Sequence, residues 1–226
     1  DLLIFDYNII REAPSQTLSS GIADALAKWY EASLSSSSST DGLVQQAVQM
    51  ARVLRDQLFI DGLDAIKNPG SDSWVRVAEG CALTAGLIGG IGGEKCRTAF
   101  AHPIHNGLTQ LRFRQKALHG EIVGVGILIQ LHLEEVHSKN LLANQAKEQL
   151  MKFLCKINTP ISIESLGLKD ISNSEIKKAC EFVLKSNNGI NDLPFTLDQK
   201  QLHKAMLKFK TTENILGRYN LTRGKQ

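Results

Sequence analysis

Three histidines that lie close together in the sequence could hold a metal ion. His102 and His105 are three residues apart in the apolar segment AFAHPIHNGL, so on a helix they share one face. His119 follows in the segment ALHGE. Imidazole is a common metal ligand, but a histidine pair on one helix face is more often structural than ligating. A further donor would shift this balance toward a metal site.

The carboxylate of Asp24 is a candidate for that further donor. It lies in the segment GIADALAKW, among alanine, isoleucine and leucine. An ionised carboxylate in such an apolar helix is costly unless it is paired or binds a cation. Lys28, four residues further on, is one candidate partner. A divalent metal is the other, and one carboxylate with two imidazoles leaves an open coordination position, as in catalytic metal sites.

The elements that carry these residues are predicted to be helices. His102 and His105 lie on one helix, and His119 lies near the start of a long apolar helix that reaches about Val136. Apolar side chains at helical spacing predict further helices over residues 18–34, 43–58, 74–88, 144–157, 173–185 and 197–211. Asp41 is a predicted N-cap of the second of these. The sequence therefore predicts an all-α fold.

The segment LLIF at residues 2–5 departs from this helical pattern. Four consecutive apolar residues followed by a polar turn predict a strand that is buried on both faces. No partner strand is evident later in the chain, and a lone strand cannot satisfy its backbone hydrogen-bonding groups. We therefore expect the chain to be a piece of a larger protein whose N-terminal part contains the rest of a sheet.

A glycine cluster, GLIGGIGG at residues 86–93, raises the question of a dinucleotide site. The nucleotide-binding fingerprint requires a strand before the glycines, so that a tight turn presents a helix N-terminus to the pyrophosphate. Here a predicted helix precedes the glycines. The cluster is therefore predicted to be a turn between two helices.

Composition and charge exclude several classes of protein. The 226 residues carry a net charge of only +3, which does not favour nucleic acid or an acidic membrane as a partner. No uninterrupted apolar stretch is long enough to span a bilayer, and no secretory signal is visible. Cys81, Cys96, Cys155 and Cys180 form no CxxC pair and are predicted to be reduced thiols. We expect a cytoplasmic protein without nucleic-acid or membrane partners.

Three of these segments, taken in order, resemble a known family. The segments GIADALAKWYEA, AFAHPIHNGLTQL and ALHGEIVGVGILIQL resemble the helical domain of the iron-containing (group III) alcohol dehydrogenases, in particular the glycerol dehydrogenase branch. The opening DLLIFDYNIIREAP resembles the last strand of that family's N-terminal domain and its crossover. The resemblance implies that residues 1–10 end a missing nucleotide-binding α/β domain. Residues 11–226 would form an all-helical, metal-binding catalytic domain of the dehydroquinate synthase-like type.

The resemblance also implies a set of site residues. Asp24, His102 and His119 match the family's metal ligands, and His105 would relay a proton or support the ligand shell. Many iron-binding relatives have a fourth ligand, a histidine, four residues after the aspartate, where this chain has Lys28. This departure favours zinc over iron. NAD or NADP would be held mostly by the missing domain.

The implied activity is that of a metal-dependent, NAD(P)-linked alcohol or polyol dehydrogenase. Its substrates would be small alcohols, polyols or carbonyl compounds, and a homo-oligomer is expected. Ile122 replaces the lysine that usually follows HGE, and the loop GGIGGEKCR lacks the aromatic residue common near the substrate, so glycerol itself is not implied. One alternative is a sugar-phosphate cyclase of the dehydroquinate synthase superfamily, which usually has glutamate in place of Asp24. The other is a non-catalytic helical relative.

Overall fold

The computed structural model describes residues 4–36, 38–111, 117–138, 140–185, 193–213 and 215. Within these ranges the secondary structure is helical, without a strand, which confirms the all-α class. The α-helices are, in chain order, α1 (Tyr7–Arg11), α2 (Ser15–Ser35), α3 (Gly42–Lys67), α4 (Asp72–Glu79), α5 (Ala85–Gly92), α6 (Ala101–Thr109), α7 (His119–His137), α8 (Leu141–Lys156), α9 (Asn173–Lys185) and α10 (Gln199–Lys208).

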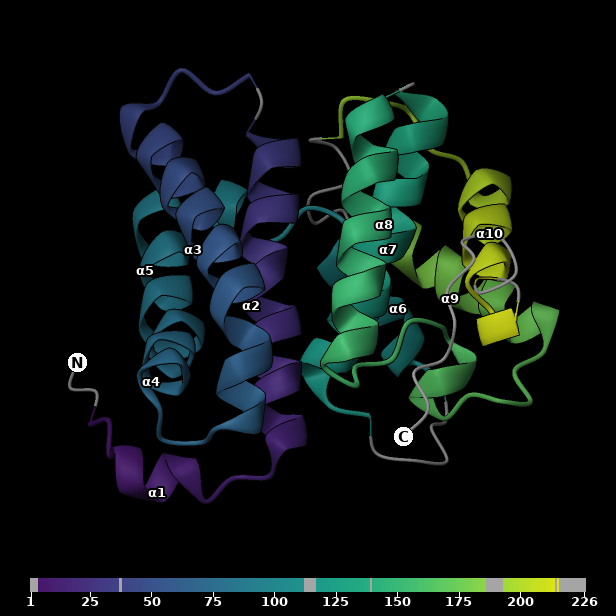
Figure 1. Ribbon diagram of the computed structural model, residues 1–226. Coiled ribbons are helices and arrows are strands. Elements are labelled where there is room, and N and C mark those ends of the chain that lie inside the picture. Colours follow the sequence, from purple (N-terminus) through teal and green to yellow (C-terminus); the bar gives the residue numbers. More distant parts are fainter. Residues whose placement is uncertain are drawn as a thin grey trace.

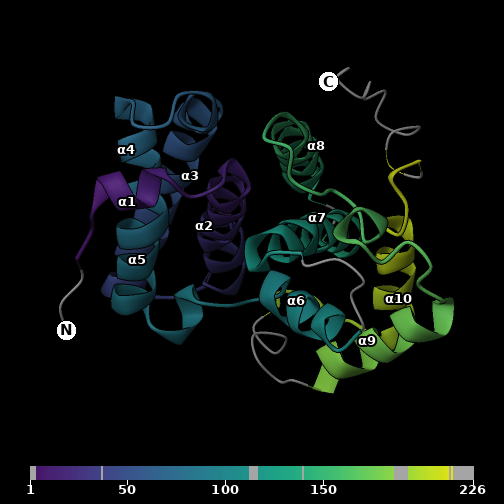
Figure 2. The same ribbon diagram turned by 90° about the horizontal axis from the view of Figure 1, so that it is seen from below.

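The helices form two groups that lie side by side. Helices α1 to α5 make one group and α6 to α10 the other (Figure 1). Helix α2 packs on α3 within its own group and on α7 across the boundary, and α7 also packs on α6 and α8. The view from below shows the same division, with α6 beside the start of α7 (Figure 2). Helices α2, α6 and α7 therefore meet where the two groups join.

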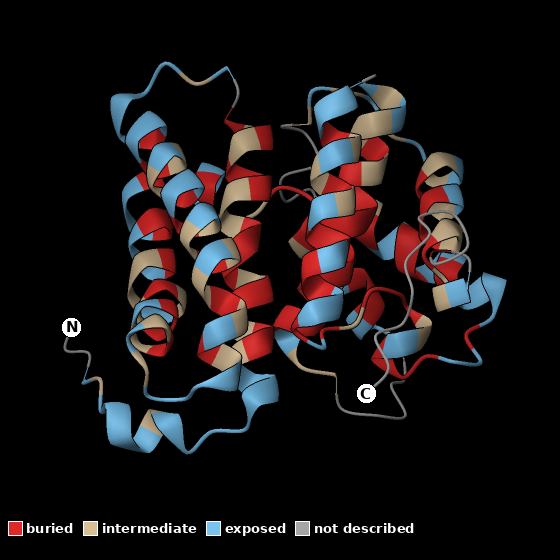
Figure 3. Ribbon diagram, in the orientation of Figure 1, coloured by how far each residue is buried: buried red, intermediate tan, exposed pale blue. Residues whose placement is uncertain are grey.

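Helix α7 is the central element of the second group. Every residue from Gly120 to Leu131 is buried, as the apolar sequence of this helix requires. Buried residues lie on the facing sides of the helices and exposed residues on the outside (Figure 3). Gln130, fully buried on α7, accepts a hydrogen bond from the N–H of Ala101 and donates one to the carbonyl of Tyr30. This side chain joins α7 to both α6 and α2.

Two glycines allow α7 to approach its neighbours closely. A Cβ atom on Gly120 would lie 1.9 Å from the carbonyl oxygen of Ser20 on α2. A Cβ atom on Gly126 would lie 2.6 Å from the carbonyl oxygen of Ala101 at the start of α6. Both distances are far below van der Waals contact, so any larger residue would push the helices apart. The crossing of α7 with α2 and α6 thus depends on these two positions.

Most predicted helices occur where the periodicity placed them. Asp41 caps α3 as predicted, because its side chain accepts hydrogen bonds from the N–H groups of Leu43 and Val44. Helix α3 is longer than its predicted range and ends at Lys67. The glycine cluster, predicted to be a turn, is largely helical, because α5 includes all of it up to Gly92. Gly93, with a φ of +64°, is the C-cap that ends the helix. A 3₁₀ turn at Glu94–Cys96 then leads to α6.

The opening segment differs from its prediction. Residues 1–3 of the predicted strand lie outside the described residues, and Ile4 and Phe5 are in neither a strand nor a helix. Residues 7–10, placed in the strand-bearing segment 1–10, belong to helix α1. Asp6 begins this helix by accepting hydrogen bonds from the N–H groups of Asn8 and Ile9. In the sequence, Asp6 is an N-cap signal for a helix, but the apolar run LLIF just before it favours a strand more strongly.

Among the described residues, one continuous helical stretch is long and apolar enough, by length and composition, to cross a membrane. It runs from Asp72 to Gly92 and includes a π-helical turn at Gly80–Thr84. The stretch contains Arg76, which pairs with Asp61 of α3 at 2.8 Å. Val77 and Ile88 of the same stretch are fully buried in the core. These contacts are those of a core helix.

The carboxyl group of Glu134 on α7 gives the fold a testable pH dependence. Burial raises the pKa of Glu134 to about 7, although the amide of Gln130 donates to it at 3.1 Å. Between about pH 4.5 and pH 7 the folded chain then binds more protons than the unfolded chain, so the free energy of unfolding falls as the pH rises. Over this pH range the free energy of unfolding should fall by up to about 3 kcal/mol in the wild type. Glu134→Gln should remove this fall. Denaturant titrations from pH 4 to 8 measure this, and parallel curves for the two proteins would contradict it.

Candidate metal centre

The structure brings Asp24, His102 and His119 together where α2, α6 and α7 meet. One donor atom from each residue lies within 4.8 Å of the other two. Oδ1 of Asp24 is 3.4 Å from Nε2 of His102 and 3.3 Å from Nε2 of His119. The three residues come from three helices, of which α2 is distant in sequence from α6 and α7. Their convergence is therefore a property of the helix packing.

The oxygen at the centre of this group lacks a hydrogen bond. Oδ1 of Asp24 is buried and has no hydrogen-bond partner of acceptable geometry among the described residues. None of the ion pairs in the described part of the chain joins Asp24 to Lys28, the alternative partner. A buried carboxylate oxygen without a hydrogen bond is unfavourable unless a cation balances it, and at this position the cation is either a protonated imidazole or a bound metal. One oxygen and two nitrogens also form a donor set that zinc accepts. The residues present thus fit a divalent metal.

A second carboxylate, Glu31, lies behind His102 and was not among the predicted site residues. Oε2 of Glu31 accepts a hydrogen bond from Nδ1 of His102. Oε1 accepts from the backbone N–H groups of Ala99 and His102, each at 3.0 Å. The side chain is 1% exposed. Its signal in the sequence is the one that singled out Asp24, a carboxylate in an apolar helix, two turns further along α2.

His105 lies behind His119 in a similar way. Nε2 of His105 is 3.0 Å from Nδ1 of His119, and Nδ1 of His105 is 2.9 Å from Oδ1 of Asn106. Because the amide oxygen only accepts, Nδ1 of His105 donates and its Nε2 is left to accept from His119. The rings of His105 and His119 meet edge to face with their centroids 4.3 Å apart. His105 therefore supports His119, a candidate metal ligand.

Glu121 fixes the start of the helix that carries His119. Its carboxylate accepts a hydrogen bond from the N–H of Leu118 at 2.8 Å, which caps α7. It also accepts one from the side-chain amide of Gln16 on α2, at 2.8 Å. The third residue of the HGE segment thus ties the first turns of α7 and α2 together, two residues after His119.

The charges around the centre shift the pKa values of its residues. Burial alone would raise the pKa of Asp24, but the imidazoles of His102 and His119 lower it well below its usual range. Burial alone would lower the pKa of His102, but the facing carboxylates of Asp24 and Glu31 raise it to about 9. Burial, together with His119 and His102, lowers the pKa of His105. A metal that binds His102 therefore has to displace a proton.

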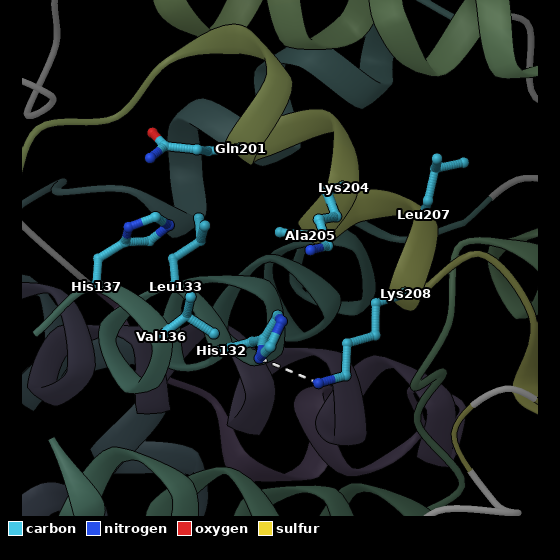
Figure 4. A pocket seen from close by; sticks show the side chains of 9 residues that line it. All are labelled: His132, Leu133, Val136, His137, Gln201, Lys204, Ala205, Leu207 and Lys208. Atoms are coloured by element: carbon cyan, nitrogen blue, oxygen red, sulfur yellow. Dashed lines mark hydrogen bonds between the residues drawn. The ribbon is translucent and has the colours of Figure 1, made fainter. Parts of the chain in front are cut away.

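The remaining histidines lie away from this centre. His132 and His137 line a cavity of about 580 Å³ between α7 and α10. Figure 4 shows them opposite Lys204 and Lys208, with Nζ of Lys208 3.3 Å from Nδ1 of His132. His203 contacts the carbonyl oxygen of Asn173. The four cysteines are free thiols, as predicted.

The fold and the centre together define a class of protein. The chain superimposes on the crystal structure of glycerol dehydrogenase from Schizosaccharomyces pombe with a TM-score of 0.82 and 26% sequence identity. The match covers 96% of this chain and 56% of that one. The chain therefore has the fold of a helical portion of a glycerol dehydrogenase.

Two curated relatives make the likeness more specific. The chain is 49% identical, over 207 residues, to an uncharacterized oxidoreductase (slr1167) of Synechocystis sp., with 92% of this chain and 54% of the relative covered. It is 29% identical, over 212 residues, to glycolaldehyde reductase of Halobacterium salinarum, with 92% and 56% covered. The chain thus spans about half the length of these relatives. No family model matches it.

Proposed function

We propose that this chain is the metal-binding helical domain of a metal-dependent, NAD(P)-linked alcohol or polyol dehydrogenase. The observation that carries the proposal is the convergence of Asp24, His102 and His119 at a buried carboxylate oxygen that makes no hydrogen bond. The fold it shares with a glycerol dehydrogenase, and its likeness to an oxidoreductase and a reductase, support the same activity.

Asp24, His102 and His119 would hold the ion, with zinc favoured over iron because Lys28 stands at the fourth ligand position. A bound divalent ion supplies Lewis acidity, which lowers the pKa of a substrate hydroxyl and favours hydride loss from its carbon. Asp24 contributes a negative charge, and the two imidazoles contribute neutral nitrogen donors. The remaining coordination position is left for a small alcohol, polyol or carbonyl compound.

His105 is the candidate for moving a proton out of the site. His105 contacts His119 on the side away from Asp24, and its ring is partly exposed. It therefore lies between the proposed site and solvent. A neutral His105 can accept a proton, and its lowered pKa keeps it neutral near pH 7. It would either support His119 or act as a relay by accepting a proton directly from the substrate, because His119 cannot pass on a proton while its Nε2 holds the ion.

The proposal includes a cytoplasmic homo-oligomer without nucleic-acid or membrane partners. The small net charge and the free thiols support this location and this choice of partners. NAD or NADP would be bound mostly by residues outside this chain, because α5 and its glycines do not follow a strand within the described residues.

The test of the proposed function is made on the purified full-length protein. We expect close to one zinc ion per chain by elemental analysis and reduction of NAD or NADP with a panel of small alcohols and diols. Removal of the ion by a chelator should abolish the reaction, and added zinc should restore it. A full-length protein that turns over normally without metal would contradict the proposal.

Residues 1–226 alone are expected to bind NADH very weakly, with a Kd of about 1 mM or above. The described residues offer no strand followed by a glycine-rich turn and a helix N-terminus to hold the pyrophosphate. Calorimetric titration of this chain with NADH measures the affinity, and the full-length protein serves as the control. Micromolar binding by residues 1–226 would mean that the helical domain has its own nucleotide site.

A further inference from the structure

We propose that Glu31 is a positioning residue that holds His102 with its Nε2 lone pair directed at the metal, and thereby sets the metal affinity of the centre. The inference rests on the proposed function, because it requires a metal at Asp24, His102 and His119. Glu31 itself does not reach the metal position, since its carboxylate lies on the Nδ1 side of the His102 ring.

The carboxylate of Glu31 is held in one orientation. Oε1 accepts two backbone hydrogen bonds at 3.0 Å, from Ala99 and His102, so rotation of the group would leave both N–H groups unpaired in the protein interior. Oε2 is thereby directed at Nδ1 of His102. Of the ion pairs formed within the described residues, Glu31 takes part only in the one with His102.

This contact determines which nitrogen of His102 is free to bind a metal. An ionised carboxylate can only accept, so Nδ1 must carry the proton and donate it to Oε2. The lone pair of a neutral imidazole is then on Nε2, the nitrogen that lies 3.4 Å from Oδ1 of Asp24. Without an acceptor at Nδ1, the ring could take the other tautomer, which presents an N–H to the metal position.

Charge balance favours the same role. A buried carboxylate needs a cation to balance it, and Glu31, which is 1% exposed, has His102 as its ion-pair partner. When His102 gives up a proton to bind a metal, the metal has to take over this balance. A divalent ion held by His102 would be balanced by the two negative charges of Asp24 and Glu31. A carboxylate hydrogen-bonded to a ligating histidine also makes the ligand nitrogen more basic.

The structural alternative is that Glu31 only caps α6, because its backbone hydrogen bonds come from the start of that helix. Glu31→Gln separates the two roles. The glutamine oxygen can still accept from Ala99 and His102, which directs its NH₂ group at Nδ1 of His102. The imidazole must then accept at Nδ1 and carry its proton on Nε2, the wrong tautomer for a metal ligand.

Gln130→Met is the matched control. Gln130 caps the same helix by accepting from Ala101, is equally buried, and contacts no ligand nitrogen. Methionine has a similar shape but cannot accept that hydrogen bond well. The control therefore loses a cap of α6, together with the hydrogen bonds to Tyr30 and Glu134, while the partner of His102 is kept.

The experiment measures Zn²⁺ affinity of the full-length protein by competition with a chromophoric chelator, and the visible absorption of the Co²⁺-loaded protein. We expect Glu31→Gln to weaken Zn²⁺ binding about 10- to 100-fold and to change the Co²⁺ spectrum. Gln130→Met should lower the melting temperature but keep the affinity within about threefold, a loss of under 1 kcal/mol of binding free energy.

The outcomes distinguish this inference from the proposed function. If Glu31→Gln binds Zn²⁺ and Co²⁺ like the wild type, Glu31 is only a cap and the inference is overturned while the metal site stands. Equal losses of affinity in Glu31→Gln and Gln130→Met would also overturn it, because a general loosening of α6 would explain both. A wild-type protein that binds no Zn²⁺ would overturn the proposed function and this inference together.

Discussion

Replacing His119 by alanine in the full-length protein is expected to abolish dehydrogenase activity and to weaken zinc binding by at least about 100-fold. The substitution leaves Asp24 and His102 as ligands, and two donors hold the ion poorly. Residues that only support a ligand change metal affinity about 10- to 100-fold, so loss of a direct ligand should weaken the affinity by at least as much. Elemental analysis and chelator competition measure the metal, and reduction of NAD(P) measures the activity.

The same variant should keep its helical fold. The side chain of His119 is 53% exposed, and its ring contacts Asp24, His102 and His105. Far-ultraviolet circular dichroism of His119→Ala should therefore match that of the wild type. His137→Ala is the control, because His137 ends the same helix but stacks on Phe195, away from the centre. Stoichiometric zinc and full turnover in His119→Ala would refute its role as a ligand.

The helices of this fold could be predicted because each buries a continuous apolar stripe. Helix α9 begins and ends where the periodicity placed it, at Asn173 and Lys185. The exceptions occur where local signals compete. Glycines 89, 90 and 92 suggested a turn, yet they continue α5 because tertiary packing outweighs their low helix propensity. The crossing of α7 with α2 could not be predicted, since the approach of Gly120 to Ser20 depends on three-dimensional packing.

The centre could be predicted only in part. Asp24 was identified by the cost of an ionised group among apolar neighbours, and the histidines by their number and spacing. Glu31 was missed although it presents the same signal, because a carboxylate with Tyr30 and Trp29 beside it also suits the edge of an amphipathic helix. Its partners, Ala99 and His102, come from a segment far along the chain. The direction of the His102 hydrogen bonds is therefore visible only in the structure.

Replacing Gly120 by alanine is expected to destabilise the protein by about 3 kcal/mol or more and to weaken zinc binding at the same time. The new methyl group would lie 1.9 Å from the carbonyl oxygen of Ser20, a backbone atom that cannot rotate away. Helices α2 and α7 would have to separate. Because Ser20 lies one turn before Asp24, and Gly120 follows His119 directly, the separation acts on two of the proposed metal ligands.

The comparison that isolates this effect is Gly86→Ala on α5. A Cβ atom on Gly86 meets nothing within 4 Å, and alanine is the better helix former, so this variant should be as stable as the wild type or up to about 1 kcal/mol more stable. Denaturant unfolding and zinc competition are measured on both variants. A shift of about 1 Å between ligands is enough to impair a metal site, so Gly120→Ala should lose affinity even where it is still folded. Wild-type stability and zinc affinity in Gly120→Ala would show that the contact between α2 and α7 does not set the geometry of the centre.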